Sequence, residues 1–263
     1  MDLKFNSQRS EKTMKKIIAI ALTCICVIAF AGCYESTVLD EAKVYEVEAE
    51  IHSMLIEINA ADFTIIESDK FLVESNLKYL SVKEEGGVLS IIEEYKPAHT
   101  CNDAMLTLYL PEGSEFDTVD IKTGAAKLTA DALSAKTVKL QLGAGDVTFG
   151  RLDATSSAII EGGAGKISVN SGILNNLDLT MGIGELNLKG SLVGNSEFVL
   201  GVGASNITLI GKKSDYKIEI QKGIGSITVD GEAVTDFENS GSGGSSLKIE
   251  GGVGSINLNF KES

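Results

Sequence analysis

The chain has 263 residues, of which 43% are hydrophobic, and its 37 acidic and 23 basic residues give a formal charge of −14. This composition is typical of a folded protein and excludes disorder over most of the length. Only one uninterrupted apolar run is present, from Ile17 to Phe30, which excludes a protein with several membrane spans. An acidic chain without a basic stripe also repels nucleic acid.

Residues 1–32 have the features of a secretory signal, which we expect to form a signal helix. Two lysines precede the apolar run, and small residues come directly before Cys33. The ending Phe-Ala-Gly-Cys resembles a bacterial lipobox, and the resemblance implies that Cys33 is lipidated and becomes the first mature residue. Met14 is an alternative start, because Met-Lys-Lys begins a compact signal. An uncleaved membrane anchor is the other interpretation, and in both cases the remainder lies outside the cytoplasm.

Residues 33–44 are predicted to be the lipidated cysteine and a short tether. Without residues 1–32 the chain keeps 18 basic and 35 acidic residues, a formal charge of −17. Such a domain is repelled by anionic lipid headgroups and wall polymers. Cys101 is the only cysteine that follows Cys33, so no internal disulfide is expected in the lipidated chain.

Residues 45–113 are predicted to form an N-terminal cap and the first coils of a repetitive domain. Terminal repeats commonly differ from internal ones because they cover an open sheet end. Ile56–Ile66 is an imperfect earlier copy of the repeat, in which Asn59–Ile65 lines up with Gly143–Phe149. The segments between it and the regular repeats are longer and poorer in glycine: Leu72–Tyr79, Val88–Glu93 and Met105–Leu110.

Residues 114–260 contain a glycine repeat. A Gly-x-Gly motif, or its Gly-x-Ala variant, returns after 19, 20, 19, 19, 22 and 29 residues. The motifs begin at Gly124, Gly143, Gly163, Gly182, Gly201, Gly223 and Gly252. A short strand follows each motif, with aliphatic residues on one face and Ser, Thr or Asn on the other.

A unit of about 20 residues cannot bury its apolar face alone, so successive units must stack. The sequence therefore predicts an all-β, single-domain β-solenoid (β-helix-like) whose coils of about 19–20 residues turn at glycine corners. The alternative is a sandwich of antiparallel hairpins, which does not predict glycine pairs on a fixed period.

Three features carry a resemblance to a known family. The alternating segment Met105–Pro111, the strand Phe116–Gly124 and the later strands punctuated by Gly-Ala-Gly-Asp resemble the bacterial β-solenoid domains called "putative adhesins". The resemblance covers roughly residues 50–260. It implies an extracytoplasmic or envelope-associated domain, and the family offers no catalytic residues to transfer.

Other motifs argue against catalysis, cofactors and metals. No Gly-x-Gly-x-x-Gly opens a helix, so nucleotide binding is not expected. The aspartate pattern of calcium-binding nonapeptide repeats is missing, and Asp236 with Glu238 is more typical of solvated surface charge. The loop from His99 to Asp103 holds a histidine, a thiol and a carboxylate, but five contiguous residues rarely orient a nucleophile. Arg151 is the only arginine after the signal, which disfavours an enzyme that cleaves acidic polysaccharides.

One outward column is a candidate binding face. If the coils are in register, a hydroxyl and amide row could bind a glycan, a peptide or ordered water. The other interpretation is that these residues suit a solvated strand and form hydrogen bonds between coils. The predicted column consists of Thr148, Ser168, Asn187, Thr208, Thr228 and Asn257.

Together these patterns predict a lipoprotein of the cell envelope that binds or scaffolds at the cell surface and is not an enzyme. Its expected partners are the membrane, through the lipid on Cys33, and an envelope polymer or protein, and the chain is expected to be a monomer. A solenoid polysaccharide-degrading enzyme is the alternative, which a carboxylate cluster within one groove would favour. A solute-binding lipoprotein ranks third, because no two-lobed α/β pattern is visible.

Overall fold

The computed structural model describes residues 39–94, 103–221 and 223–262. Within these ranges the protein forms β-strands and one 3-10 turn, η1 (Lys213–Asp215), and no α-helix. The prediction of an all-β fold is confirmed. The predicted signal segment 1–32, Cys33 and Cys101 lie outside the described residues. None of the described segments is a helix of the length and apolarity needed to span a membrane.

The strands of the N-terminal part are β1 (Lys43–Glu46), β2 (Ser53–Ile58), β3 (Asp62–Ser68), β4 (Leu72–Ser75), β5 (Leu80–Glu85), β6 (Val88–Glu93), β7 (Met105–Pro111) and β8 (Phe116–Ala125). The later strands are β9 (Lys127–Val169), β10 (Ile173–Asn175), β11 (Leu177–Val193), β12 (Asn195–Ile210), β13 (Tyr216–Gln221), β14 (Ile224–Val229), β15 (Glu232–Val234), β16 (Phe237–Ser240), β17 (Ser245–Glu250) and β18 (Val253–Lys261).

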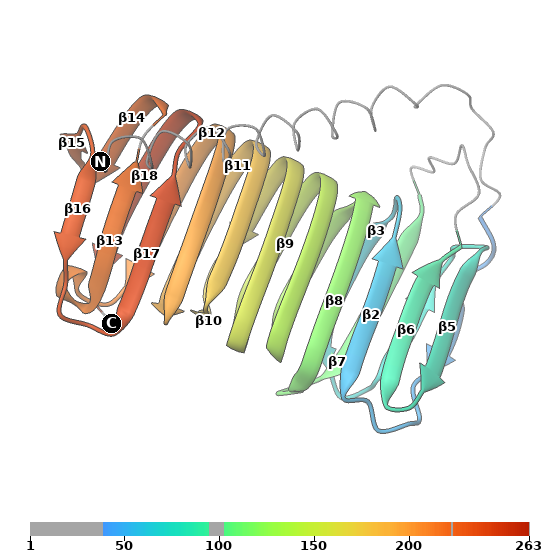
Figure 1. Ribbon diagram of the computed structural model, residues 1–263. Coiled ribbons are helices and arrows are strands. Elements are labelled where there is room, and N and C mark those ends of the chain that lie inside the picture. The colour runs from blue at the N-terminus through green and yellow to red at the C-terminus, as the bar shows by residue number, and fades with distance from the viewer. Residues whose placement is uncertain (1–38, 95–102, 222, 263) are drawn as a thin grey trace, which may run out of the picture.

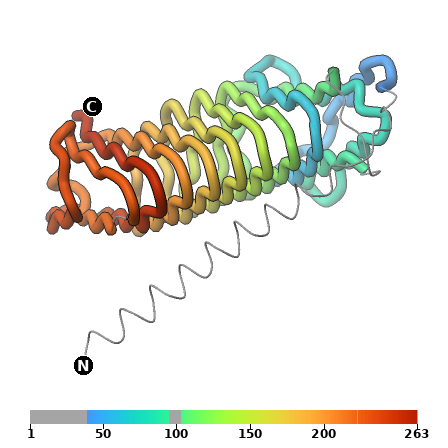
Figure 2. The backbone as a smooth tube through the Cα atoms, turned by 90° about the horizontal axis from the view of Figure 1, so that it is seen from above, coloured from blue at the N-terminus to red at the C-terminus, as the bar shows by residue number. Residues whose placement is uncertain are grey.

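The long strands run around the molecule and pair in parallel with the same part of the next turn (Figures 1 and 2). Strand β11 pairs with β9 on one side and with β12 on the other, and both pairings join residues 19 apart. Leu179, for example, lies between Ile160 and Phe198. Because these pairings are parallel and follow the glycine period, the alternative of an antiparallel hairpin sandwich is wrong for this part of the chain.

The parallel register lines up buried side chains into continuous rows. One row contains an apolar residue from each level of the stack, and every member is at most 2% exposed. Complete burial of one such side chain stabilises the fold by about 1.5–3 kcal/mol. In spatial order the row is Ile91, Ile56, Ile121, Leu140, Ile160, Leu179, Phe198, Ile249 and Ile218.

The coils do not stack in chain order at either end, contrary to the expectation that successive units stack. Near the C-terminus, β17 and β18 lie between β12 on one side and β13 with β14 on the other. Near the N-terminus, β2 and β3 lie between the later pairs β6 with β7 and β8 with β9. At the C-terminal end the chain forms the outermost coil, β13 with β14, before the coil inside it, β17 with β18. At the N-terminal end it forms the inner coil, β2 with β3, and then the outermost one, β6 with β7. In both cases the segment between the two coils covers the outer sheet edge.

Antiparallel strands cover both ends of the stack. At one end β5 pairs with β6, while β4 pairs with β7 and carries β1 on its other side. At the other end β16 pairs with β13, and β15 pairs with β14. These strands are short and carry charges such as Lys83, Glu84 and Glu238, which is how natural proteins protect exposed edges from pairing with another chain.

The corner of each coil approaches its neighbour too closely for a side chain. Gly203 has a φ of +144°, and a Cβ added there would lie 1.7 Å from the backbone oxygen of Gly184. Gly254 repeats both features against Gly203 in the next coil. The glycine period therefore reflects a steric requirement between stacked backbones, combined with a left-handed backbone conformation.

We predict that Gly203→Ala lowers the free energy of unfolding by more than about 3 kcal/mol, because both the φ angle and the added Cβ conflict with the native coil. Urea denaturation followed by circular dichroism would measure this. Gly244→Ala is the matched control, since no atom lies within 4 Å of its added Cβ. It is expected to change stability by no more than about 0.5 kcal/mol. Equal effects of both substitutions would contradict the steric explanation.

Candidate functional site

A polar row follows the glycine corner on the next strand of each coil. Ser168 pairs with Asn187, Asn187 with Asn206, and Asn206 with Asn257. Thr228 pairs with Asn257 from the other side. Thr148 belongs beside Ser168, because Gly165 lies against Gly145 three residues earlier in each coil. We call the row from Thr148 to Thr228 the polar ladder.

One predicted member of this row was wrong. Thr208 pairs with Lys189 and Asn259, so it belongs to the neighbouring column. Its place is taken by Asn206, which the sequence prediction missed. The distance from the corner was the signal that could have found it, since every ladder residue lies three positions after the second glycine of its Gly-x-Gly motif.

The ladder is longer than predicted and extends into the N-terminal coils. Thr64 pairs with both Thr129 and Thr107, and these threonines occupy the same position on the corresponding strands. The corner before Thr64 is Asn59-Ala60-Ala61 and lacks glycine. The sequence alignment of this corner with Gly143-Ala144-Gly145 placed Thr64 opposite Thr148, but the predicted column began only at Thr148.

The amides of the ladder bond to one another along the stack. Asn257 donates through Nδ2 to Oδ1 of Asn206 at 2.9 Å, and Asn206 donates in the same way to Asn187 at 2.9 Å. Thr228 donates its hydroxyl to Oδ1 of Asn257 at 2.8 Å. These contacts are the hydrogen bonds between coils that the second interpretation of this row predicted. Whether the face also binds a ligand stays a prediction.

The ladder connects to a charged row beside it. Asn187 donates to Oε1 of Glu185 at 2.7 Å, and the Lys166 ammonium lies 3.3 Å from the same oxygen. The hydrogen bond from Asn187, and secondly the contact with Lys166, hold the pKa of Glu185 below its ordinary value. The same row carries Lys127 opposite Asp62 in the N-terminal coils.

A second row lies on the corner itself and is apolar. The middle residues of four Gly-x-Gly motifs are Ile183, Val202, Val253 and Ile224, in spatial order, and they pair directly with one another. We call these four residues the corner ridge. Their exposed fractions are 47%, 49%, 47% and 75%, respectively. Contiguous exposed aliphatic side chains are unusual on a strongly acidic protein and mark a candidate contact surface.

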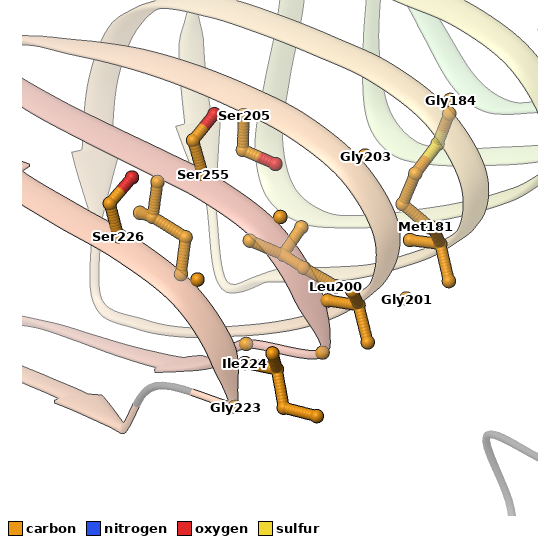
Figure 3. A pocket seen from close by; sticks show the side chains of 17 residues that line it. Met181, Gly184, Leu200, Gly201, Gly203, Ser205, Gly223, Ile224, Ser226 and Ser255 are labelled. Atoms are coloured by element: carbon orange, nitrogen blue, oxygen red, sulfur yellow. The ribbon is translucent and has the colours of Figure 1, made fainter.

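The sequence prediction missed the corner ridge, although the signal was present. The middle residue of the motif is alanine at positions 125, 144 and 164 and becomes isoleucine or valine from Ile183 onward. The prediction used the spacing of the glycines and did not consider the residue between them. Figure 3 shows this corner, with glycines of successive coils following one another and Ile224 at its edge.

The space beneath the corner is too small for an organic ligand. The cavity lined by Leu200, Val202 and Ile224, among others, has a volume of about 20 Å³ (Figure 3). A cavity of this size holds about one water molecule. The corner therefore offers an outer surface for contact, while its interior is filled.

The remaining candidate residues from the sequence are placed as follows. Asp236 and Glu238 lie at the C-terminal end cap, and His99 lies outside the described residues. Within the described ranges, no three His, Cys, Asp or Glu side chains form a group that could hold a metal ion. Arg151 donates from Nε to Oδ2 of Asp153 at 2.6 Å, and both residues lie in β9.

We predict that Asn187→Ala raises the pKa of Glu185 toward its ordinary value, because the substitution removes the first cause of its depression. Carbon-13 NMR titration of the Glu185 carboxyl would measure the change. Since the folded-state pKa is lowered, the stabilisation from this contact is present above the ordinary pKa of glutamate and is lost as pH falls through the folded value. Asn259→Ala in the neighbouring column is the control, and an unchanged Glu185 in Asn187→Ala would contradict the assignment.

Three solved structures have distant similarity to this chain. A "putative cell adhesion protein" from Clostridium sporogenes is 17% identical, with a TM-score of 0.39 and coverage of 84% of this chain and 99% of that one. A "putative lipid binding protein" from Parabacteroides distasonis is 16% identical, with a TM-score of 0.42 and coverage of 85% and 99%. A "putative adhesin" from Parabacteroides merdae is 12% identical, with a TM-score of 0.43 and coverage of 86% and 99%.

Similarity at this level transfers no function. No protein of curated function matches the chain. A family model does match it, over residues 47–259, which includes the polar ladder, the corner ridge and both end caps except β1. The chain belongs to the Toastrack DUF4097 family.

Proposed function

We propose that the protein is a lipid-anchored β-solenoid on the outer face of a bacterial cell membrane, and that it acts by binding and not by catalysis. The signal-like residues 1–32 and the lipobox-like ending at Cys33 support the anchor. The parallel register of β9, β11 and β12 at the glycine period supports the solenoid.

The corner ridge is the observation that carries the binding role. The four side chains are exposed in register while the ladder amides beside them are already bonded to one another. Their burial against a partner would gain about 25 cal/mol for each Å² of apolar surface removed from water. A formal charge of −17 beyond residue 32 opposes contact with anionic wall polymers. We therefore propose that the ridge binds in an apolar groove of an envelope protein.

The position of the corner ridge fits this role. The described chain begins at residue 39 and enters the end cap formed by β1, β4 and β5, whereas the ridge lies toward the opposite end (Figure 1). At about 4.8 Å between strands, the ridge starts about 24 Å from the β7 level and ends about 38 Å from it. With a lipid on Cys33, the ridge would lie in the half of the stack that is farther from the anchored end cap.

The anchor is tested by Cys33→Ser in the full chain expressed in a bacterial host. We expect the wild-type protein to lack residues 1–32 and to carry the added mass of a lipid, and the variant to carry no lipid, because a serine hydroxyl cannot form the thioether link. Intact-mass measurement of the membrane fraction would check this. A wild-type protein that keeps residues 1–32 and carries no lipid would favour the uncleaved anchor instead.

The ridge is tested by cosedimentation of residues 34–263 with isolated envelopes of the producing bacterium. We expect saturable binding that falls at least about tenfold when Val202, Val253 and Ile224 are all replaced by serine, since a few buried aliphatic contacts are worth more than 1.4 kcal/mol. Ile173→Ser is the matched control, because Ile173 is 52% exposed on another face.

Two outcomes would change the assignment. If protease treatment of the envelopes leaves binding intact, the occupant is a polymer and not a protein. If the triple variant binds like wild type while remaining folded, the corner ridge has no binding role.

A further inference from the structure

A cavity of about 230 Å³ lies away from the ridge, and its lining comes from the N-terminal coils and from β9. It is bounded by the end of β3, the turn between β7 and β8, and two stretches of β9. Its volume is far larger than the 20 Å³ and 10 Å³ of the corner cavities. It is smaller than the roughly 300–1,000 Å³ of sites for drug-sized ligands, which points to a small molecule.

Arg151 is paired with a buried carboxylate at this cavity. Its Nε donates to Oδ2 of Asp153 at 2.6 Å, and Oδ1 of the same carboxylate accepts from the backbone N–H of Ile173 at 2.8 Å. The Asp153 side chain is 10% exposed, whereas that of Arg151 is 65% exposed. The buried carboxylate therefore orients the guanidinium and uses one of its five N–H groups. The others are available to a carboxylate ligand, which arginine binds through two parallel hydrogen bonds.

The opposite charge is also present at this cavity. Glu67 is the penultimate residue of β3 and Glu115 lies in the turn before β8, and both are exposed residues of the lining. Together with Asp153 they give the lining three negative charges against the one positive charge of Arg151, which is paired with Asp153. A simple anion would be repelled by the glutamates. A simple diamine would pair with the glutamates but leave the remaining N–H groups of Arg151 unused, whereas a molecule that carries both kinds of group uses both.

Part of the lining is apolar. Leu110, Leu133 and Ala132 contribute to it, and Leu110 and Leu133 are only 3% and 2% exposed. An aliphatic spacer between the charged groups of a ligand would lie against these side chains, as in small-molecule sites that combine apolar and polar groups.

We propose that this cavity is a binding site for an aliphatic diamino acid, whose carboxylate is held by Arg151 and whose ammonium groups lie toward Glu67 and Glu115. The site is separate from the corner ridge and does not depend on it. The same cavity has the composition that the polysaccharide-degrading alternative requires, with carboxylates beside an arginine. Its volume and the engagement of both Asp153 oxygens favour the smaller ligand and a binding role.

The experiment uses the full-length protein in detergent and follows amide chemical shifts by NMR. The probes are L-lysine, glutarate, which lacks the amines, and 1,5-diaminopentane, which lacks the carboxylate. Each is added to about 10 mM, ten times the ~1 mM dissociation constant that a few charge contacts support. We expect L-lysine to shift residues around Arg151 and Ile173, and to bind at least about tenfold more tightly than either other probe.

Two variants make the test specific. Arg151→Lys should weaken L-lysine binding about tenfold, because a lysine cannot form the paired contact. Glu115→Gln changes an exposed turn residue that interacts electrostatically with Lys136, and it should weaken L-lysine binding while strengthening glutarate binding. Glu232→Gln at the opposite end cap is the control and should change neither.

Three results would overturn the proposal. These are no shifts with L-lysine, equal binding of L-lysine and 1,5-diaminopentane, or binding that is unchanged in both Arg151→Lys and Glu115→Gln. A preference for glutarate would instead assign the cavity to anions.

Discussion

The close approach of one backbone to the next at the Gly-x-Gly corner is the constraint on which the rest of the structure depends. At Gly203 and Gly254 the backbone of the neighbouring coil occupies the space that a Cβ would need. Each coil must therefore turn at the same point as the coil beside it. This shared corner sets the 19-residue offset of the β9, β11 and β12 pairings, and the offset in turn decides which side chains become neighbours.

Because the coils are aligned, residues at the same position of successive coils form a continuous row. An apolar residue at one position of each coil gives a continuous core row, and an asparagine three residues after the corner gives the polar ladder. A branched aliphatic residue between two glycines gives the corner ridge. Because the coils are about 4.8 Å apart, each row is a regular surface feature that a single strand could not provide. The end caps then stop the row of coils, so that the parallel edges do not pair with another molecule.

Local pattern predicted much of this correctly. The glycine period, the alternation within the strands and the absence of helix-forming segments in residues 45–260 all agree with the described structure. The error at Thr208 has a physical cause. Ser205 occupies the position that an aliphatic residue fills in other coils, and it is 5% exposed there. Counting from the nearest aliphatic residue, Ile207, therefore shifted the alignment by two positions and replaced Asn206 with Thr208.

The sequence by itself determined the strands, their buried faces and their corners, because alternation and glycine placement act within a single coil. Only the tertiary structure decided the order of the coils. The segments 72–85 and 232–240 cover the sheet edges, and this moves β6 with β7 and β13 with β14 to the ends of the stack. No local pattern specifies such an exchange, since it depends on which edge would otherwise face solvent. The cavity at Arg151 has the same origin, because it joins residues from β3, β7 and β9 that meet only after the coils have stacked.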